Sequence, residues 1–373
     1  MFKDISYDAY SEVKRQFSLG LTTAMGVVLK TTNKSLIPRI IAPENFEESF
    51  NEFLNNCDSN NSSMATRKAS KACLDFFVKE MPELVGGSAD LTPSNNTFSE
   101  SSSTFSNENP KGNHINYGVR EFGMSAIMNG MVLHGGIKPY GATFLVFTDY
   151  ARNAVRLSAL MGLPNIFVYT HDSVALGEDG PTHQPIEHLV TLRSTPNLNN
   201  WRPADLVETS VAWKDAVTST KTPTCLIFSR QGTSAITRSQ DQLNAIKKGG
   251  YLLDQSDNPD MTIIASGSEV QLALDAAKQL KSESKNINVV SMPSLDIFLQ
   301  QSEEYQRSII NPDKPVLVVE CSHPNSWYKI LNRNDKVIGI ETFGESAPGG
   351  ELLEHFGFTE ENVIKTVKSL LND

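Results

Sequence analysis

The chain has 373 residues, 39% of them hydrophobic and 20% charged, which is enough sequence for two or three domains with buried cores. Its formal net charge of -10 and its pI near 5.3 argue against nucleic acid or an anionic membrane as the main partner, because both require a basic face. No run of about 18 apolar residues is present, and the start MFKDISYDAY lacks the apolar region of a signal peptide, so we expect a cytoplasmic protein. The cysteines lie far apart with no CxxC pairing, so neither a zinc site nor a disulfide framework is indicated.

Residues 1–63 are predicted to form a helical N-terminal extension or linker and not a complete domain. Phe46, Phe50 and Phe53 recur at helical spacing, and the polar segment NNCDSNNSS follows them. A linker of that composition cannot bury much surface, so a domain boundary is expected directly before Met64.

Residues 64–236 are predicted to form an α/β domain. Strand patterns alternate with helical patterns, and this alternation is typical of a parallel, doubly wound sheet. The predicted helices are MATRKASKACLDFFVKEM, EFGMSAIMNGMVLHGG and DYARNAVRLSALMG, and the predicted strands are ELVGGSADL, PYGATFLVF, NIFVYT, DLVETS and PTCLIFS.

Residues 237–373 are predicted to form a second, smaller α/β domain. Strands are expected in DMTIIA, INVVSMPS, KPVLVVEC and DKVIGIETF. GSE at 267–269 opens a helix whose amides could hold an anion, although simple helix capping explains the same residues.

The segment 170–185, THDSVALGEDGPTHQP, follows an apolar strand pattern and is the strongest candidate for a binding loop. Ligands of open α/β sheets bind beyond the carboxyl ends of the strands, so we expect His171, Asp179 and His183 to line a crevice. A solvated polar loop is the alternative.

Four residues at predicted strand ends or helix starts could bind a phosphorylated substrate: Arg67, Ser94, His171 and Arg230. Each arginine could equally form an ordinary surface ion pair.

Glu121 begins an otherwise apolar helix, where it either complements the helix dipole or serves as a functional acid. Phe144, Phe147 and Tyr150 cross from a strand into a helix. They could cradle a flat ring, or they could belong to the core.

Several of these motifs together resemble the transketolase family. They are ATRKAS, GGSADLTPSN, YGVREFGM, ATFLVFTDYARNAVR, THDSVALGEDGPTHQP, WRPAD, SRQ, GSEV, SMPS and GESAP, in family order. The resemblance implies a pyrimidine-binding domain over residues 64–236 and a transketolase C-terminal domain over residues 237–373, each with a mainly parallel sheet flanked by helices.

The resemblance also implies roles for the candidate residues. Glu121 matches the family's catalytic glutamate, which hydrogen-bonds the aminopyrimidine of thiamine diphosphate. Phe147 matches the aromatic residue that stacks on the aminopyrimidine, with Phe144 and Tyr150 beside it. Arg67, Ser94, His171 and Arg230 match the phosphate-binding set, and Asp179 and His183 match the residues that contact the donor's hydroxyls.

The family transfers a two-carbon ketol unit from a ketose phosphate such as xylulose 5-phosphate to an aldose phosphate such as ribose 5-phosphate, in the pentose phosphate pathway. Its N-terminal domain holds the diphosphate and Mg²⁺ or Ca²⁺, and no motif for that domain is found here, so no metal ligands are expected in this chain. We therefore expect the C-terminal part of a split enzyme that needs a separate N-terminal subunit and assembles as a homodimer or heterotetramer. The alternatives are a truncated, inactive fragment or a related ketol transferase such as dihydroxyacetone synthase.

Overall fold

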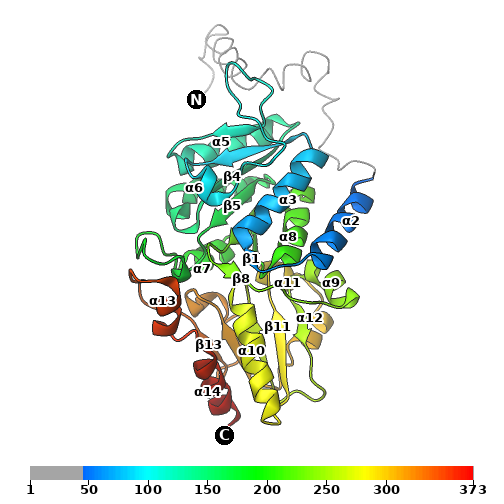
Figure 1. Ribbon diagram of the computed structural model, residues 1–373, viewed down its shortest axis with the longest axis vertical. Helices are drawn as coiled ribbons and strands as arrows, with labels where there is room; N and C mark the ends of the chain where they lie inside the picture. Colours follow the sequence, from blue (N-terminus) through cyan, green and yellow to red (C-terminus); the bar gives the residue numbers. More distant parts are fainter. Residues whose placement is uncertain (1–44, 373) are drawn as a thin grey trace.

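The computed structural model describes residues 45–372, so residues 1–44 of the predicted extension lie outside the described residues. Two α/β domains stack along the long axis of the molecule, with the N-terminal domain at one end and the C-terminal domain at the other (Figure 1). Among the described residues, no helix is long and apolar enough to cross a membrane.

The N-terminal domain is built on a six-stranded sheet in which every pair of neighbouring strands is parallel, in the order β3-β2-β4-β5-β7-β6. The strands are β2 (Leu84–Ser88), β3 (His114–Asn116), β4 (Lys138–Phe144), β5 (Ile166–Thr170), β6 (Asn199–Trp201) and β7 (Thr224–Phe228). This topology confirms the predicted mainly parallel sheet.

Strand β5 shows how the sheet is covered on both faces. Its alternate residues Ile166 and Val168 join the core cluster under α3 and α8, whereas Phe167 and Tyr169 join the cluster under α5 and α6. Every residue of β5 is buried, as expected for a central parallel strand. The helices of this domain are α3 (Thr66–Glu80), α4 (Thr92–Asn95), α5 (Glu121–His134), α6 (Thr148–Met161), α7 (His188–Arg193) and α8 (Leu206–Thr218), with short 3₁₀ turns η2 (Leu145–Phe147) and η3 (Val174–Leu176).

Helix α2 (Phe46–Ser59) packs against the domain that follows it, beside α3 and α8 (Figure 1). Phe50 stacks on Phe77 of α3, and Phe53 stacks on Phe76. The helix continues to Ser59, so it includes most of the polar segment 55–63 that was expected to be an exposed linker. Cys57 in that segment is buried, so the segment contributes more to the core than its composition predicted.

A two-stranded antiparallel ribbon joins the beginning and end of the N-terminal domain. Strand β1 (Met64–Ala65) pairs with β8 (Gly232–Thr233), with Met64 opposite Thr233. The start of β1 coincides with the boundary predicted before Met64.

The C-terminal domain contains a five-stranded sheet in the order β13-β12-β10-β11-β9, of which only β9 is antiparallel. Helices α10 and α14 share a core cluster with one face of this sheet, and α11 and α12 share a cluster with the other. The strands are β9 (Tyr251–Asp254), β10 (Met261–Ala265), β11 (Ile287–Ser291), β12 (Val316–Val319) and β13 (Lys336–Ile338), and the helices are α9 (Gln240–Ala245), α10 (Glu269–Ser282), α11 (Leu295–Phe298), α12 (Glu303–Ile309), α13 (Gly349–His355) and α14 (Glu360–Leu371), with 3₁₀ turns η4 (Ile246–Lys248) and η5 (Pro324–Ser326).

Buried ion pairs join the two domains. Arg193 of α7 binds Glu320 through two hydrogen bonds of 2.7 Å each, and Arg202 contacts both Asp172 and Glu269. Burial by itself would raise the pKa of Glu320, but Arg193, Arg202 and the Ser266 hydroxyl together lower it to about 2. Removing one partner of such a pair would leave a buried charge, so these contacts fix the domains against each other.

One predicted strand is wrong. DLVETS forms the start of α8, because the carboxylate of Asp205 accepts a hydrogen bond from the Glu208 amide and caps the helix. The short strands β3, β6 and β9 were not anticipated as separate elements. The GSE turn lacks the side-chain capping that was one of its two interpretations, since Ser268 makes no cap bond, and the Glu269 carboxylate binds Arg202. Anion binding by its amides stays a prediction.

Candidate active site

The candidate residues gather at the carboxyl edge of the N-terminal sheet. Phe144 ends β4 opposite Thr170 of β5, and Thr170 lies opposite Phe228 at the end of β7. The chain therefore delivers Phe144, His171 and Arg230 to one edge, where ligands of parallel sheets bind.

His171 is the most constrained residue of this edge. It has a left-handed backbone with φ of 61°, is 3% exposed, and stacks on Phe144 with 3.7 Å between ring centroids. The Thr170 hydroxyl donates to Asn95 Oδ1, so at 2.7 Å it accepts a hydrogen bond from His171 Nδ1 and leaves Nε2 facing outward from that contact.

Burial, followed by the neighbouring Arg67, Arg230 and His183, lowers the pKa of His171 to about 3. The imidazole is consequently neutral at physiological pH, although it stands beside two permanent cations.

Arg67 and Arg230 are brought together by a contact between the first and last segments of the N-terminal domain. The Thr66 amide donates to Ser229 Oγ at 3.1 Å, and the Ser229 amide donates to Thr66 Oγ1 at 2.7 Å. These reciprocal bonds place the following residues of each segment side by side, although they lie far apart in the sequence.

The two arginines lack an acidic partner among residues 45–372. Burial and the charge of Arg230 lower the pKa of Arg67, and the buried Nε of Arg67 has no hydrogen-bond partner. Arg67 Nη1 donates to the main-chain carbonyl of Ser94 at 2.7 Å. The surface ion pair considered from the sequence is therefore absent from this part of the chain, and the pair of cations is suited to an anion.

An aromatic wall continues from the cations. Phe144 stacks on Phe147 with ring centroids 5.7 Å apart, and Phe147 lies 6.0 Å from Tyr150 and 5.5 Å from His183. Phe144 is buried, Phe147 is half-buried and Tyr150 is 68% exposed. The exposure of the rings therefore increases from Phe144 to Tyr150, and the rings of Phe147 and Tyr150 can stack on a flat ligand.

Glu121 lies at the first position of α5, directly after the loop that follows edge strand β3. It is 8% exposed, and its carboxylate forms no hydrogen bond or ion pair with any described residue. A buried carboxylate without a partner is available to a ligand.

The side chains of two predicted site residues, Ser94 and Asp179, form no hydrogen bond, ion pair or ring contact with the other candidate residues within 45–372. Ser94 touches Arg67 through its carbonyl, not its hydroxyl. Asp179 is exposed, and within residues 45–372 it makes no hydrogen bond, ion pair or ring contact. The proposed roles of both residues remain predictions.

The C-terminal domain braces the loop that carries Asp179 and His183. The buried side-chain amide of Gln184 donates to the carbonyls of Gly177 at 2.9 Å and Glu345 at 2.8 Å. Ser346 Oγ donates to the Glu178 carbonyl at 2.5 Å. Residues 170–177 of the loop are buried, as are Gln184 and Pro185, whereas the turn around Asp179 is exposed and His183 is half-buried. The solvated polar loop that composition allowed therefore applies only to this turn.

The sequence motifs included supporting residues whose role was not foreseen. Arg202 of WRPAD and Glu269 of GSEV are both buried, and Arg202 pairs with Glu269 and with Asp172, the residue directly after His171. The arginine and the acid are visible within their motifs, but their mutual contact depends on the packing of two domains.

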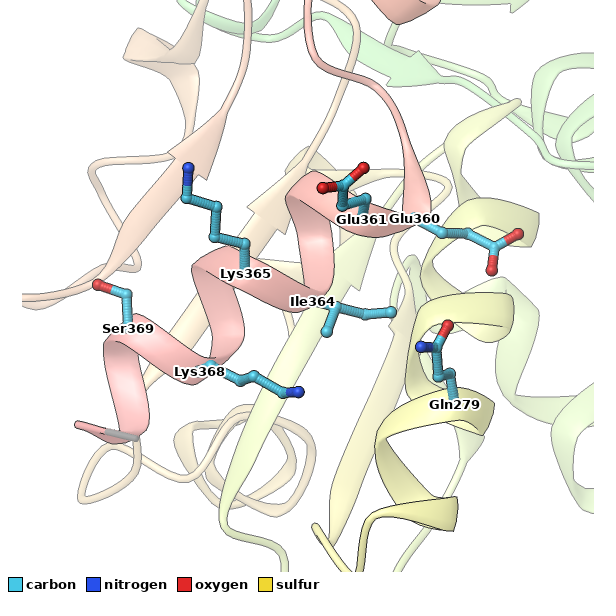
Figure 2. A pocket seen from close by; sticks show the side chains of 7 residues that line it. All are labelled: Gln279, Glu360, Glu361, Ile364, Lys365, Lys368 and Ser369. Atoms are coloured by element: carbon cyan, nitrogen blue, oxygen red, sulfur yellow. The ribbon is translucent and has the colours of Figure 1, made fainter.

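A surface pocket of about 740 Å³ lies elsewhere, in the C-terminal domain between α10 and α14 (Figure 2). Ile364 and Glu360 face Gln279 across it, and lysines and acids of α14 complete the lining. None of the candidate residues lines this pocket, and its mixed charges do not favour one ligand class. The carboxyl edge is the better candidate because its polar groups converge.

Comparison with known proteins agrees with this architecture. Residues 62–234 match the transketolase pyrimidine-binding domain, and residues 249–359 match the transketolase-like C-terminal domain. Transketolase 1 of Vibrio parahaemolyticus is 51% identical over 331 residues, which are 88% of this chain and 50% of that protein. The chain thus spans about half the length of the curated relatives it matches.

Two solved structures extend the comparison. Transketolase of Pichia stipitis in complex with sedoheptulose 7-phosphate has a TM-score of 0.80 and 44% identity, over 84% of this chain and 46% of that one. A split-gene transketolase described as an inactive β4 tetramer has a TM-score of 0.65 and 26% identity, over 83% of this chain and 99% of that one. With both of its domains matched, this chain belongs to the transketolase family.

Proposed function

We propose that this chain is the C-terminal part of a split transketolase, which transfers a two-carbon ketol unit from xylulose 5-phosphate to ribose 5-phosphate and depends on a separate N-terminal subunit. The observation that carries the proposal is the meeting of Arg67, Arg230 and His171 beside an aromatic wall at the carboxyl edge of the sheet. Sugar phosphates and a heteroaromatic cofactor are the ligands that this combination suits.

Phosphate binding is assigned to the paired arginines. Their charges lie close enough to lower the pKa of Arg67, so a phosphate dianion between them would relieve the repulsion. Arg67 would hold one side and Arg230 the other, and His171 and Ser94 would complete the phosphate-binding set. Asp179 and His183 would contact the hydroxyls of the donor. The Pichia stipitis relatives were solved with sedoheptulose 7-phosphate and, for another variant, with xylulose 5-phosphate.

Thiamine diphosphate fits the remaining features. Phe147 and Tyr150 offer accessible ring faces, and Glu121 offers a buried, unpartnered carboxylate that can share a proton with a pyrimidine nitrogen. When bound, the cofactor would supply the carbanion chemistry of ketol transfer. Glu121 would hold the proton at the ring nitrogen, and the aromatic wall would orient the ring and exclude water.

An exposed apolar face on α5 and α6 supports a partner. Soluble proteins seldom expose many large apolar side chains together, and such faces mark interfaces. Exposed members on or beside these two packed helices are Val119, Phe122, Ile127, Leu133, Tyr150, Leu157, Leu160 and Met161. Because Glu121 and Tyr150 lie on the same helices, a subunit seated there would complete the site.

The N-terminal subunit would bring the diphosphate-binding residues and the Mg²⁺ or Ca²⁺ that accompanies them. The split-gene neighbour, which this chain matches over 99% of its length, supports a separately encoded partner. A heterotetramer or a homodimer in the cytoplasm follows from the same proposal.

A coupled assay for glyceraldehyde 3-phosphate tests the proposal. Xylulose 5-phosphate, ribose 5-phosphate, thiamine diphosphate and Mg²⁺ are supplied to this chain, to a polypeptide that matches the other half of the relatives, and to the mixture. We expect activity in the mixture alone. Activity of the chain alone would overturn the requirement for a partner, and a folded, assembled but silent mixture would overturn the enzymatic assignment.

A further inference from the structure

A second group of ligating side chains lies where α6 and α7 begin. Asp149 is in the first turn of α6, Glu187 directly precedes α7, and His188 is its first residue. One potential ligand atom from each of the three residues lies within 4.8 Å of the others.

His188 is the observation that distinguishes this group from an ordinary acidic cluster. Its side chain is only 5% exposed, and both of its ring nitrogens are buried without a hydrogen-bond partner. Burying a polar atom without a partner is energetically unfavourable, so a buried imidazole with two such atoms calls for a ligand.

The ring faces carboxylates on both sides. His188 Nε2 lies 3.2 Å from Asp149 Oδ2, and His188 Nδ1 lies 3.9 Å from Glu187 Oε2. Two ligands bound to one ion at about 2.1 Å stand roughly 3.2–3.4 Å apart in near-tetrahedral geometry, so Asp149 and His188 already have that spacing.

Glu187 lies on the Nδ1 side of the ring, so its side chain would have to turn toward Asp149 to bind an ion held at Nε2. The Glu187 carboxylate is 54% exposed and the Asp149 carboxylate is 65% exposed, so both can adjust and water can occupy the remaining positions. A chain with a net charge of -10 also favours a cation electrostatically.

We propose that Asp149, Glu187 and His188 bind one divalent cation of borderline softness, such as Zn²⁺ or Co²⁺. Imidazole with two carboxylates suits these ions better than Mg²⁺ or Ca²⁺, which take oxygen ligands. The site is separate from the metal that accompanies the diphosphate in the proposed function, because it is formed entirely by this chain.

The bound ion would cross-link two elements that frame the candidate active site. Helix α6 begins directly after Phe147, and α7 begins shortly after the loop that carries His183. A cation joining the two helix starts would fix the aromatic wall against the substrate loop.

The test uses the tag-free, metal-free full chain without any partner. Zn²⁺ is titrated by calorimetry, and Co²⁺ is followed by its visible absorption. We expect one saturable site per chain, a loss of affinity of more than about tenfold in Asp149→Asn, and its disappearance in His188→Gln. His355→Gln is the matched control, since His355 forms an exposed pair with Glu345 at 3.8 Å outside the group.

Two results would overturn the site. One is equal binding by the wild type and Asp149→Asn, an exposed position at which folding is not at risk. The other is no saturable binding of either ion by the wild type. A Zn²⁺-dependent rise in Tm of the wild type and His355→Gln, missing in Asp149→Asn, provides a second readout. No turnover is measured, so the outcome is independent of the proposed function.

Discussion

The imidazole of His171 lies flat against the ring of Phe144, with 3.7 Å between their centroids and two arginines nearby. This contact buries a titratable ring among cations, which explains why its pKa is depressed to about 3. The unliganded edge therefore holds a neutral base where an anion is expected to bind.

Phosphate binding is predicted to be coupled to proton uptake by His171. One negative charge of the phosphate about 4 Å away favours the imidazolium by about 4 kcal/mol at an effective dielectric of about 20, which is about 3 pKa units. The pKa of His171 would then rise from about 3 to about 6. Phosphate binding should therefore take up protons at pH values between about 3 and about 6. The affinity for phosphate should fall as the pH rises toward about 6.

Calorimetry of inorganic phosphate binding in buffers of different ionisation enthalpy measures this uptake. At about pH 5.5, phosphate binding to the wild type should take up most of one additional proton compared with binding to His171→Asn. At about pH 8, the proton uptake of the two proteins should be the same. Asparagine tolerates the left-handed backbone at this position, so the variant keeps the loop. Identical buffer dependence at both pH values would show that His171 does not contact the phosphate.

Arg67→Ala and Arg230→Ala are each predicted to raise KM for phosphorylated donors. A lost charge-assisted hydrogen bond costs about 1.5–3 kcal/mol, or roughly 10–100-fold, and because phosphate binds equally in ground and transition states kcat should change little. Steady-state kinetics of the reconstituted enzyme checks this against an unphosphorylated donor, whose KM should stay within about threefold. Arg307→Ala, which removes an exposed pair with Glu303, serves as the control. A uniform loss on both donors would contradict a phosphate-specific role.

Glu121→Gln is predicted to lower turnover of the reconstituted enzyme by at least about 100-fold while leaving assembly intact, because the amide keeps the volume but cannot take the proton. Assembly is followed by sedimentation. Glu83→Gln is a matched control, since Glu83 is exposed and precedes β2 at the opposite edge of the same sheet. Near wild-type turnover in Glu121→Gln would remove the assigned role.

The adjacent glycines Gly349 and Gly350 should respond oppositely to alanine. A Cβ on Gly349 would lie 2.3 Å from the Ala175 carbonyl oxygen in the braced loop, whereas a Cβ on Gly350 meets nothing within 4 Å. Gly349→Ala should therefore destabilise the chain by about 1–3 kcal/mol and raise donor KM. Gly350→Ala should be neutral or stabilising by less than about 1 kcal/mol.

Urea unfolding and donor kinetics separate the two variants. If both behave alike, the contact between α13 and the loop does not support the site.

The sequence was most informative where one periodicity dominated. The all-apolar run at β5 and the amphipathic pattern at α3 predicted both elements, because burial on two faces or one face leaves different patterns. DLVETS misled because its Val and Thr favour strands, whereas the capping carboxylate of Asp205 decided the local structure.

The candidate site could be named from motifs but not assembled from them. Arg67 and Arg230 meet only because Thr66 and Ser229 exchange hydrogen bonds across the domain. The clamp of Arg202 on Asp172 and Glu269 likewise requires both domains to be folded. Such long-range contacts have no local signature. The placement of Asp179 and Ser94 in the site stays a prediction.

The pairing of β1 with β8 brings the two ends of the N-terminal domain together at one point. A module whose entrance and exit coincide can be inserted, exchanged or circularly permuted with little disturbance to its neighbours. A short loop linking Met64 to Thr233, with new termini in the exposed stretch around Lys111, should preserve the sheet. A domain moved as one cassette would, however, leave Arg193 and Arg202 without their buried partners Glu320 and Glu269, so those partners would have to move with it or be replaced.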